Sequence, residues 1–153
     1  MSAVLTVGQA RRVALVADSH GSVQPAVLAA LGAIAPVLAI RGNNDTPARW
    51  PRGEQAACAA LPDTLCLQLG EALLAVVHGH RWPAVATRHA RLRAAWPQAR
   101  WVVYGHSHRR VVDDAALPWV LNPGACGQAR AHGGAGWLEL RRTARGWRIW
   151  QPD

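Results

Sequence analysis

The chain has 153 residues, close to the usual size of one compact domain, so we expect residues 1–153 to form a single domain. Half of the residues are hydrophobic and only 17% are charged, which excludes a disordered chain. The net charge is +8 and every basic residue is an arginine. Because these arginines are scattered rather than gathered in a stripe with aromatic residues, specific nucleic-acid binding is disfavoured.

A membrane-spanning or secreted chain is also disfavoured. The long uncharged stretch at 22–40 is interrupted by Pro25, Gly32 and Pro36, which suits a surface helix followed by a strand. The apolar run after Arg11 and Arg12 is too short for a signal peptide. The three cysteines are odd in number and form no C-x-x-C pair, which is typical of reduced thiols, so we expect a cytoplasmic protein.

The first half of the chain predicts a strand–helix–strand unit. Val13–Ala17 is a continuous apolar run, typical of a buried strand. Gln24–Ile34 is rich in Ala and Leu and ends before a proline, which predicts a helix. Val37–Ile40 predicts the second strand, and the Pro- and Gly-punctuated segment Trp50–Pro62 predicts an irregular stretch with one or two helical turns.

The second half predicts a hairpin, a helix and several short strands. Leu65–Leu69 and Leu73–Val77 flank a Gly-Glu turn, and Pro83–Trp96 is helical in composition, with Arg88, Arg91 and Arg93 expected on a solvated face. Four further runs predict short antiparallel strands after a buried strand at Trp101–Tyr104: Val111–Val112, Trp119–Leu121, Trp137–Arg141 and Trp147–Trp150.

Polar clusters follow four of the predicted strands. Loops beyond the carboxyl ends of strands in an α/β sheet meet at one edge, where such folds bind ligands. Imidazole and carboxylate without thiolate favour Mn²⁺, Fe or Zn²⁺ over a structural cysteine-type zinc site. The sequence therefore predicts a metal site built from four clusters: Asp18-x-His20, Gly42-Asn43-Asn44-Asp45, His78-Gly-His80 and Gly105-His106-x-His108.

Other polar and aromatic residues have simpler interpretations. His89 and His132 stand alone, and a lone histidine is more often an ordinary surface or capping residue than a ligand. Asn122-Pro-Gly124 is either a turn or a turn that also shapes the pocket. The tryptophans at 119, 137, 147 and 150 alternate with apolar neighbours, which favours packing over base stacking.

The order D-x-H, G-N-x-D, H-G-H, G-H-x-H, N-P-G between Val13 and Gly124 resembles the calcineurin-like metallophosphoesterase superfamily, in particular its small YfcE-like bacterial and archaeal phosphodiesterase branch. The resemblance implies an αββα sandwich of two mixed β-sheets flanked by helices. It also implies two metal positions, the first held by Asp18, His20 and His108 and the second by Asn43, His78 and His106.

The sequence departs from this family at two points. No strand ending in Gly-Asp lies between His20 and Asn43, so the carboxylate that bridges the two metals is missing and the fold is one βα unit shorter. Either Val37–Ile40 pairs beside Val13–Ala17 and brings Asp45 near the metals, or Asp45 stays outside them. Where many relatives have a histidine that protonates the leaving group, this chain has Asn44, which cannot be that acid, and His80 is the nearest candidate.

Three functions follow from these observations. The first is a metal-dependent phosphoesterase, most simply a phosphodiesterase, that acts on a small phosphoester or a nucleotide with one or two divalent ions, Mn²⁺ first and Fe, Zn²⁺ or Ni²⁺ as alternatives. The second is a catalytically impaired metal-binding or protein-interaction domain of the same fold, as in the retromer subunit that resembles this family. The third is a nucleic-acid binder. The sequence names neither the natural substrate nor an oligomeric state.

Overall fold

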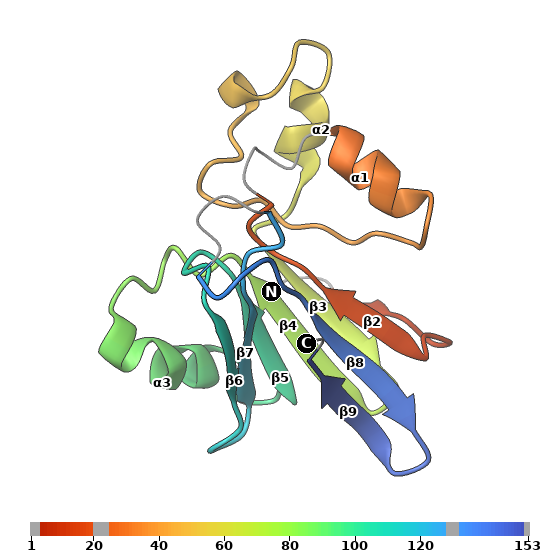
Figure 1. The fold of residues 1–153 in the computed structure, drawn as a ribbon, viewed down its shortest axis with the longest axis vertical. Coiled ribbons are helices and arrows are strands. Elements are labelled where there is room, and N and C mark those ends of the chain that lie inside the picture. Colours follow the sequence, from red (N-terminus) through yellow and green to blue (C-terminus); the bar gives the residue numbers. More distant parts are fainter. Residues whose placement is uncertain (1–3, 20–24, 128–131, 152–153) are drawn as a thin grey trace.

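The computed structural model describes residues 4–19, 25–127 and 132–151, which form two β-sheets packed face to face with helices around them (Figure 1). The smaller sheet has the order β2 (Arg12–Leu15), β8 (Leu138–Thr143) and β9 (Gly146–Trp150). The larger sheet has six strands in the order β1 (Val4–Thr6), β3 (Thr64–Leu69), β4 (Ala72–Val77), β5 (Trp101–Tyr104), β7 (Trp119–Pro123) and β6 (Arg110–Asp113).

The six-stranded sheet is mixed, whereas the described pairs of the three-stranded sheet are all antiparallel. β3 and β4 form the expected antiparallel hairpin, and β5 lies parallel between β4 and β7. Sequence analysis did not predict β1, which adds to the edge of the larger sheet parallel to β3. In the smaller sheet β2 pairs antiparallel with β8, which pairs antiparallel with β9.

The main core fills the space between the sheets. Strand β5 is buried along its whole length, as expected for a central strand covered on both faces. Its residues Trp101 and Val103 point into this core, where leucines from both sheets meet them, including Leu15 of β2 and Leu138 of β8.

The opposite face of the six-stranded sheet is covered by helix α3 (Val85–Ala95). Leu92 of α3 is fully buried against Val102 and Tyr104 of β5. The prediction that Arg88 lies on a solvated face is wrong: its side chain is only 7% exposed and donates to the carbonyls of Trp82 and Pro83. These carbonyls precede the helix and lie outside its hydrogen bonds, so Arg88 gives two loop carbonyls a partner.

The remaining helices form a lobe beyond one end of the sheets, which we call the helical lobe (residues 25–61; Figure 1). It contains α1 (Pro25–Gly32), the 3₁₀ turn η1 (Pro47–Arg49) and α2 (Gln55–Ala60). Its described side chains are mostly exposed, and the buried ones are Asp45, Trp50 and Cys58. The predicted helix and irregular segment of this region are therefore present, with little packing around them.

The predicted strand at Val37–Ile40 is wrong, because these residues have no regular secondary structure. The expectation that they pair beside β2 is wrong for the same reason: within the described residues β2 pairs with β8 alone. β2 is consequently less buried than predicted, with Leu15 its one buried residue. An apolar run becomes a strand only where a neighbour offers hydrogen bonds, and Val37–Ile40 has none.

None of the described helices is long and apolar enough to cross a bilayer. Cys58, Cys66 and Cys126 are free thiols, as expected.

Candidate metal centre

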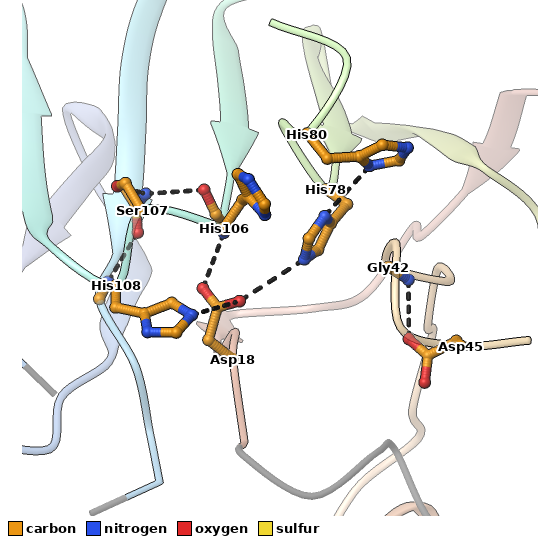
Figure 2. Close-up of polar contacts among 11 residues, drawn as sticks. Asp18, Gly42, Asp45, His78, His80, His106, Ser107 and His108 are labelled. Atoms are coloured by element: carbon orange, nitrogen blue, oxygen red, sulfur yellow. Dashed lines mark hydrogen bonds and ion pairs between the residues drawn. The ribbon is translucent and has the colours of Figure 1, made fainter. Parts of the chain in front are cut away.

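Three strands carry polar residues to the same end of the two sheets (Figure 2). Asp18 follows β2, His78 follows β4, and His106 and His108 follow β5. The site is therefore built at the carboxyl ends of strands from both sheets, as the pattern of clusters predicted.

Asp18 lies at the centre of this group. Its Oδ1 atom is 3.5 Å from Nε2 of His78 and 3.5 Å from Nε2 of His108, and its Oδ2 atom accepts the backbone N–H of His106 at 2.8 Å. The Asp18 side chain is only 6% exposed. One carboxylate oxygen thus anchors the β5 loop, while the other faces two imidazoles.

The backbone around Asp18 adopts a conformation that most side chains avoid. Asp18, His106 and His108 have φ angles of 51°, 70° and 56°, and in the described part of the chain they are the non-glycine residues with positive φ. Left-handed backbone costs a residue with a Cβ of the order of 1 kcal/mol or more. Three such residues converge on one carboxylate, which is typical of a functional site rather than of a structural loop.

His78 is held by its neighbours on two sides. Its Nδ1 atom lies 3.2 Å from Nδ1 of His80, so its Nε2 atom is the one turned toward Asp18 (Figure 2). Gly42 packs against the ring, and a Cβ at this position would come within 2.9 Å of His78 Nε2. A larger residue at position 42 would therefore displace the imidazole.

Hydrogen bonds from the fully buried side chain of Asn122 fix the loop after β5. Its side-chain amide donates to the carbonyl of Gly105 and to Oγ of Ser107, at 3.2 and 2.9 Å, and its Oδ1 accepts the N–H of Gly124. The Asn-Pro-Gly segment is thus a turn that also shapes the site, through a side chain rather than through backbone groups alone.

Two histidines of the site, His106 and His80, favour the neutral form. Burial lowers the pKa of His106, and the nearby His78 lowers it further. Burial also lowers the pKa of His80, again with a contribution from His78. Neutral imidazole is the form that binds a metal ion.

The cluster at 42–45 does not join this group in the same way. Asn43 and Asn44 are exposed, and the Asn44 side chain accepts a hydrogen bond from Arg49. Asp45 accepts the N–H of Gly42 at 2.7 Å and the indole N–H of Trp50 at 3.4 Å. These contacts belong to the helical lobe, so Asp45 supports the Gly42 turn. The predicted ligand His20 lies outside the described residues.

Asp18, His78 and His108 present pairs of donor atoms at the spacing that a divalent cation requires. Ligand atoms on a tetrahedral cation with bonds of about 2.1 Å lie about 3.4 Å apart. The two 3.5 Å separations between Asp18 Oδ1 and the His78 and His108 Nε2 atoms match this spacing. Within the described residues no group of three or more His, Cys, Asp or Glu side chains is placed to hold a metal ion as it stands, so Asp18, His78 and His108 need a further ligand.

His89 is a residue that sequence reasoning set aside and that the structure places in a network behind the site. Its ring bridges Asp113 Oδ2, at 2.5 Å, and the hydroxyl of Tyr104, at 3.0 Å, and Arg93 pairs with the same aspartate at 2.7 Å. This network ties α3 to Tyr104 at the end of β5, two residues before His106. A lone histidine in a helix carries no sequence signal for such a role.

The chain matches a known protein family along most of its length. The family model for the calcineurin-like phosphoesterase superfamily domain matches residues 2–142. A search of curated proteins found no match.

Several solved structures share the fold at low sequence identity. An archaeal phosphodiesterase is 17% identical, with a TM-score of 0.62, and the match covers 92% of this chain and 99% of that one. A Thermotoga maritima protein is 19% identical, with a TM-score of 0.60 and coverage of 94% and 99%. Vps29 from Entamoeba histolytica, solved with Zn²⁺, is 15% identical, with a TM-score of 0.56 and coverage of 98% of each chain. The expected sandwich of two sheets flanked by helices is confirmed.

Proposed function

Because the chain belongs to the calcineurin-like phosphoesterase superfamily, we propose that it is a metal-dependent phosphodiesterase. The observation that carries this proposal is the group of Asp18, His78, His106 and His108, three of them in left-handed backbone, around one buried carboxylate oxygen. A chain that had lost its function would not be expected to keep this costly arrangement.

Asp18, His78 and His108 would hold a divalent cation, with His20 as the expected further ligand of the Asp18 position and His106 beside it. A cation at this position would lower the pKa of a bound water and offset negative charge on the phosphoryl oxygens. We propose Mn²⁺ first, with Fe, Zn²⁺ and Ni²⁺ as alternatives. The three free thiols support a reducing compartment, which we propose to be the cytoplasm.

The protein's own groups orient the site. The N–H of His106 holds Asp18 Oδ2, which leaves Oδ1 directed between the two imidazoles. His80 fixes the rotation of the His78 ring, and Asn122 fixes the loop that carries His106 and His108. Such outer contacts commonly alter metal affinity or activity by ten- to a hundredfold, as an order of magnitude.

The site offers only a sparsely protonated acid for the leaving group. Asn44 cannot donate a proton as an acid, and it is exposed and paired with Arg49. His80 is the nearest candidate, but the lowered pKa of its ring leaves little of the protonated form at neutral pH. We therefore propose that the enzyme prefers phosphodiesters whose leaving group is stable as an anion, rather than alkyl phosphomonoesters.

The test measures metal content and turnover on the same preparation. Purified protein is analysed for bound metal, stripped with a chelator and reloaded with Mn²⁺, and hydrolysis of bis(p-nitrophenyl) phosphate is compared with that of p-nitrophenyl phosphate. The proposal expects turnover of the diester that disappears with the chelator and returns with Mn²⁺. Turnover that ignores the chelator, or no turnover with any of the four metals, contradicts it.

A catalytically impaired interaction domain is the second candidate. One observation favours it: the segment from Pro25 to Ile40 carries no charged residue, and its described side chains include no buried one. Ile34 is 84% exposed and Leu38 50% exposed, as expected for a surface that a partner covers. Protein that binds metal tightly and turns over neither ester would favour this candidate.

A further inference from the structure

One aromatic residue, Tyr104, stands where the two histidine loops of the candidate metal centre leave the larger sheet. It is the last residue of β5 and pairs in parallel register with Val77, the last residue of β4. The two loops begin directly after these residues, and the N–H of Gly105 donates to the carbonyl of His78 at 3.1 Å. The backbones of the two loops are therefore joined at their first residues.

The Tyr104 ring also packs against the loop that follows β4. Gly79 lies between His78 and His80 in the chain and has a φ angle of 96°. A Cβ on Gly79 would lie 3.1 Å from Cδ2 of Tyr104 and 3.2 Å from the carbonyl oxygen of Gly105. Because the loop backbone is in direct contact with the ring, a shift of Tyr104 would move Gly79 and, with it, the adjoining His78.

The hydroxyl of Tyr104 is bonded to helix α3. Tyr104 is only 3% exposed, and its hydroxyl oxygen lies 3.0 Å from Nε2 of His89. The two rings meet edge to face, with their centroids 5.6 Å apart. A buried hydroxyl that loses its partner costs about 1–3 kcal/mol, so this bond fixes the orientation of the Tyr104 ring.

Asp113 determines which nitrogen of His89 faces the hydroxyl. Nδ1 of His89 lies 2.5 Å from Oδ2 of Asp113, and Arg93 pairs with Oδ1 at 2.7 Å. Burial raises the pKa of Asp113, but hydrogen bonds from Arg93 and His89 bring it below its ordinary value, so the carboxylate is an acceptor. Nδ1 of His89 therefore carries a hydrogen, and in the neutral ring Nε2 accepts the O–H of Tyr104.

Arg88, the neighbour of His89 on α3, makes a second contact with the same ring. Its guanidinium carbon lies 5.6 Å from the centroid of the Tyr104 ring, within the range of a cation–π interaction. Hydrogen bonds to the carbonyls of Trp82 and Pro83 hold this guanidinium in place. One helix thus holds the tyrosine that supports both histidine loops.

We propose that His89 is a positioning residue of the metal centre, which acts through Tyr104 to set where His78 and His106 lie. This inference rests on the proposed function, because it assigns these imidazoles to a divalent cation. His89 touches neither the cation nor the substrate in this role. Contacts behind metal ligands commonly alter metal affinity by ten- to a hundredfold, as an order of magnitude.

The first test measures Mn²⁺ affinity from the electron paramagnetic resonance signal of free Mn²⁺ during titration of the full chain. H89A and Y104F should each weaken binding about tenfold. Because both remove the same hydrogen bond, the double variant should bind no more weakly than the weaker single variant. Losses that add in the double variant, or a loss in only one single variant, overturn the proposal.

Two further variants separate positioning from a loss of stability. H89Q offers the Tyr104 hydroxyl a side-chain carbonyl and should bind Mn²⁺ within about twofold of the wild type. Leu69 is 1% exposed and lies in β3 at the hairpin turn, the opposite end of β4 from His78. L69V should lower the free energy of unfolding by about 1 kcal/mol and leave Mn²⁺ affinity unchanged.

A loss of Mn²⁺ affinity in L69V as large as in H89A would trace the effect to stability and overturn the proposal. A loss in H89Q equal to that in H89A would do the same, because the hydrogen bond to Tyr104 would then be without effect. If H89A does not fold, H89N, whose side chain is too short to reach Tyr104, is measured in its place.

The second test needs no metal. The ring C–H signals of His78 and His106 are assigned by nuclear magnetic resonance from variants of each residue and compared in metal-free protein. Both signals should shift in H89A and in Y104F and keep their wild-type positions in L69V. Signals that stay in place in H89A and Y104F would show that the two imidazoles do not depend on His89, which overturns the proposal.

Kinetics separate this inference from the proposed function. With bis(p-nitrophenyl) phosphate at saturating Mn²⁺, H89A should lower kcat about tenfold and leave KM within about twofold, because no contact with the substrate is removed. If the wild type does not hydrolyse the diester while the imidazole signals respond as predicted, the proposed function fails and the positioning role stands. If the wild type hydrolyses it and H89A equals the wild type in Mn²⁺ affinity and kcat, the positioning role fails and the proposed function stands.

Discussion

The six-stranded sheet and the helical lobe contribute to the site in opposite ways. Strand β5 is buried at each of its positions, and it delivers His106 and His108 to Asp18. The helical lobe buries few of its side chains, and its Asn43 stays exposed. Side chains reach a metal position accurately only when the backbone that carries them is packed. The two predicted metal positions should therefore differ in strength.

The largest expected effect is on activity, and it compares a predicted metal ligand of the packed region with one of the helical lobe. His106→Ala should lower kcat/KM for an activated phosphodiester about a thousandfold, equivalent to about 4 kcal/mol of transition-state stabilisation. Asn43→Ala should lower it about tenfold or less, because Asn43 is exposed on the sparsely packed helical lobe, whereas His106 lies on the loop that the buried strand β5 carries to Asp18. Kinetics at saturating Mn²⁺ measure both. An unchanged thermal transition is the control for folding, and equal losses in the two variants would remove the distinction.

Core truncation gives the next largest effect. Leu74 of β4 is fully buried between the sheets, so Leu74→Ala should lower the free energy of unfolding by about 3 kcal/mol. Leu38 in the helical lobe is 50% exposed, and Leu38→Ala should cost about 0.5 kcal/mol. Urea denaturation measures both values. A cost at Leu38 as large as that at Leu74 would mean that the lobe is packed in solution.

The stability of the smaller sheet should depend on pH. Within the described residues β2 has one strand neighbour, β8, and an ion pair between Arg12 and Glu139 joins the two strands. Glu139 is 1% exposed, and hydrogen bonds from Arg12, then Arg141, lower its pKa from 4.5 to about 2. Because the folded state lowers the pKa of Glu139, its ionised carboxylate stabilises the fold at pH values above the ordinary pKa of 4.5. This stabilisation is lost as the pH falls from about 4.5 toward 2.

We expect about 2 kcal/mol from this group, since Arg12 is largely exposed and solvent screens the pair. Thermal unfolding between pH 6 and about pH 2.5 should show a smaller acid-induced loss in Glu139→Gln than in the wild type. Parallel curves would show that Glu139 titrates normally.

The smallest effect concerns nucleic acid. The arginines are distributed over both regions, with Arg52 in the helical lobe and Arg91 on α3 as examples, so binding to a duplex should be weak and independent of sequence. It should fade at about 150 mM salt, because scattered charges are screened at that ionic strength. Fluorescence anisotropy measures it, and a sub-micromolar complex that survives this salt would restore the nucleic-acid function.

The sequence predicted most strands of the packed region, and in the helical lobe it predicted the helix but wrongly placed a strand at Val37–Ile40. Runs such as Trp101–Tyr104 are apolar without interruption because both faces of the strand are covered, and that constraint is visible in the residues themselves. Val37–Ile40 is also an uninterrupted apolar run, but it has no strand beside it, and strand pairing depends on the whole fold. Arg88 was misjudged because carbonyl acceptors such as that of Trp82 leave no mark in the sequence.

The sequence also predicted some residues of the candidate site and missed others. The aspartate and histidine clusters after β2, β4 and β5 were predicted from their place at strand ends, and the structure brings Asp18, His78, His106 and His108 together. The role of His89 could not be predicted, because it depends on Asp113 and Tyr104. Such contacts arise only from tertiary packing.

The central claim is a cation at Asp18 that is bound more tightly than any at the Asn43 position. A crystal structure from protein grown with excess Mn²⁺, with anomalous peaks measured at both positions, tests it most directly. We predict a strong peak within bonding distance of Asp18 and His108 and a weak peak or none beside Asn43, because a neutral amide offsets less cation charge than a carboxylate does. Two peaks of equal height, or no peak at Asp18, would contradict the account.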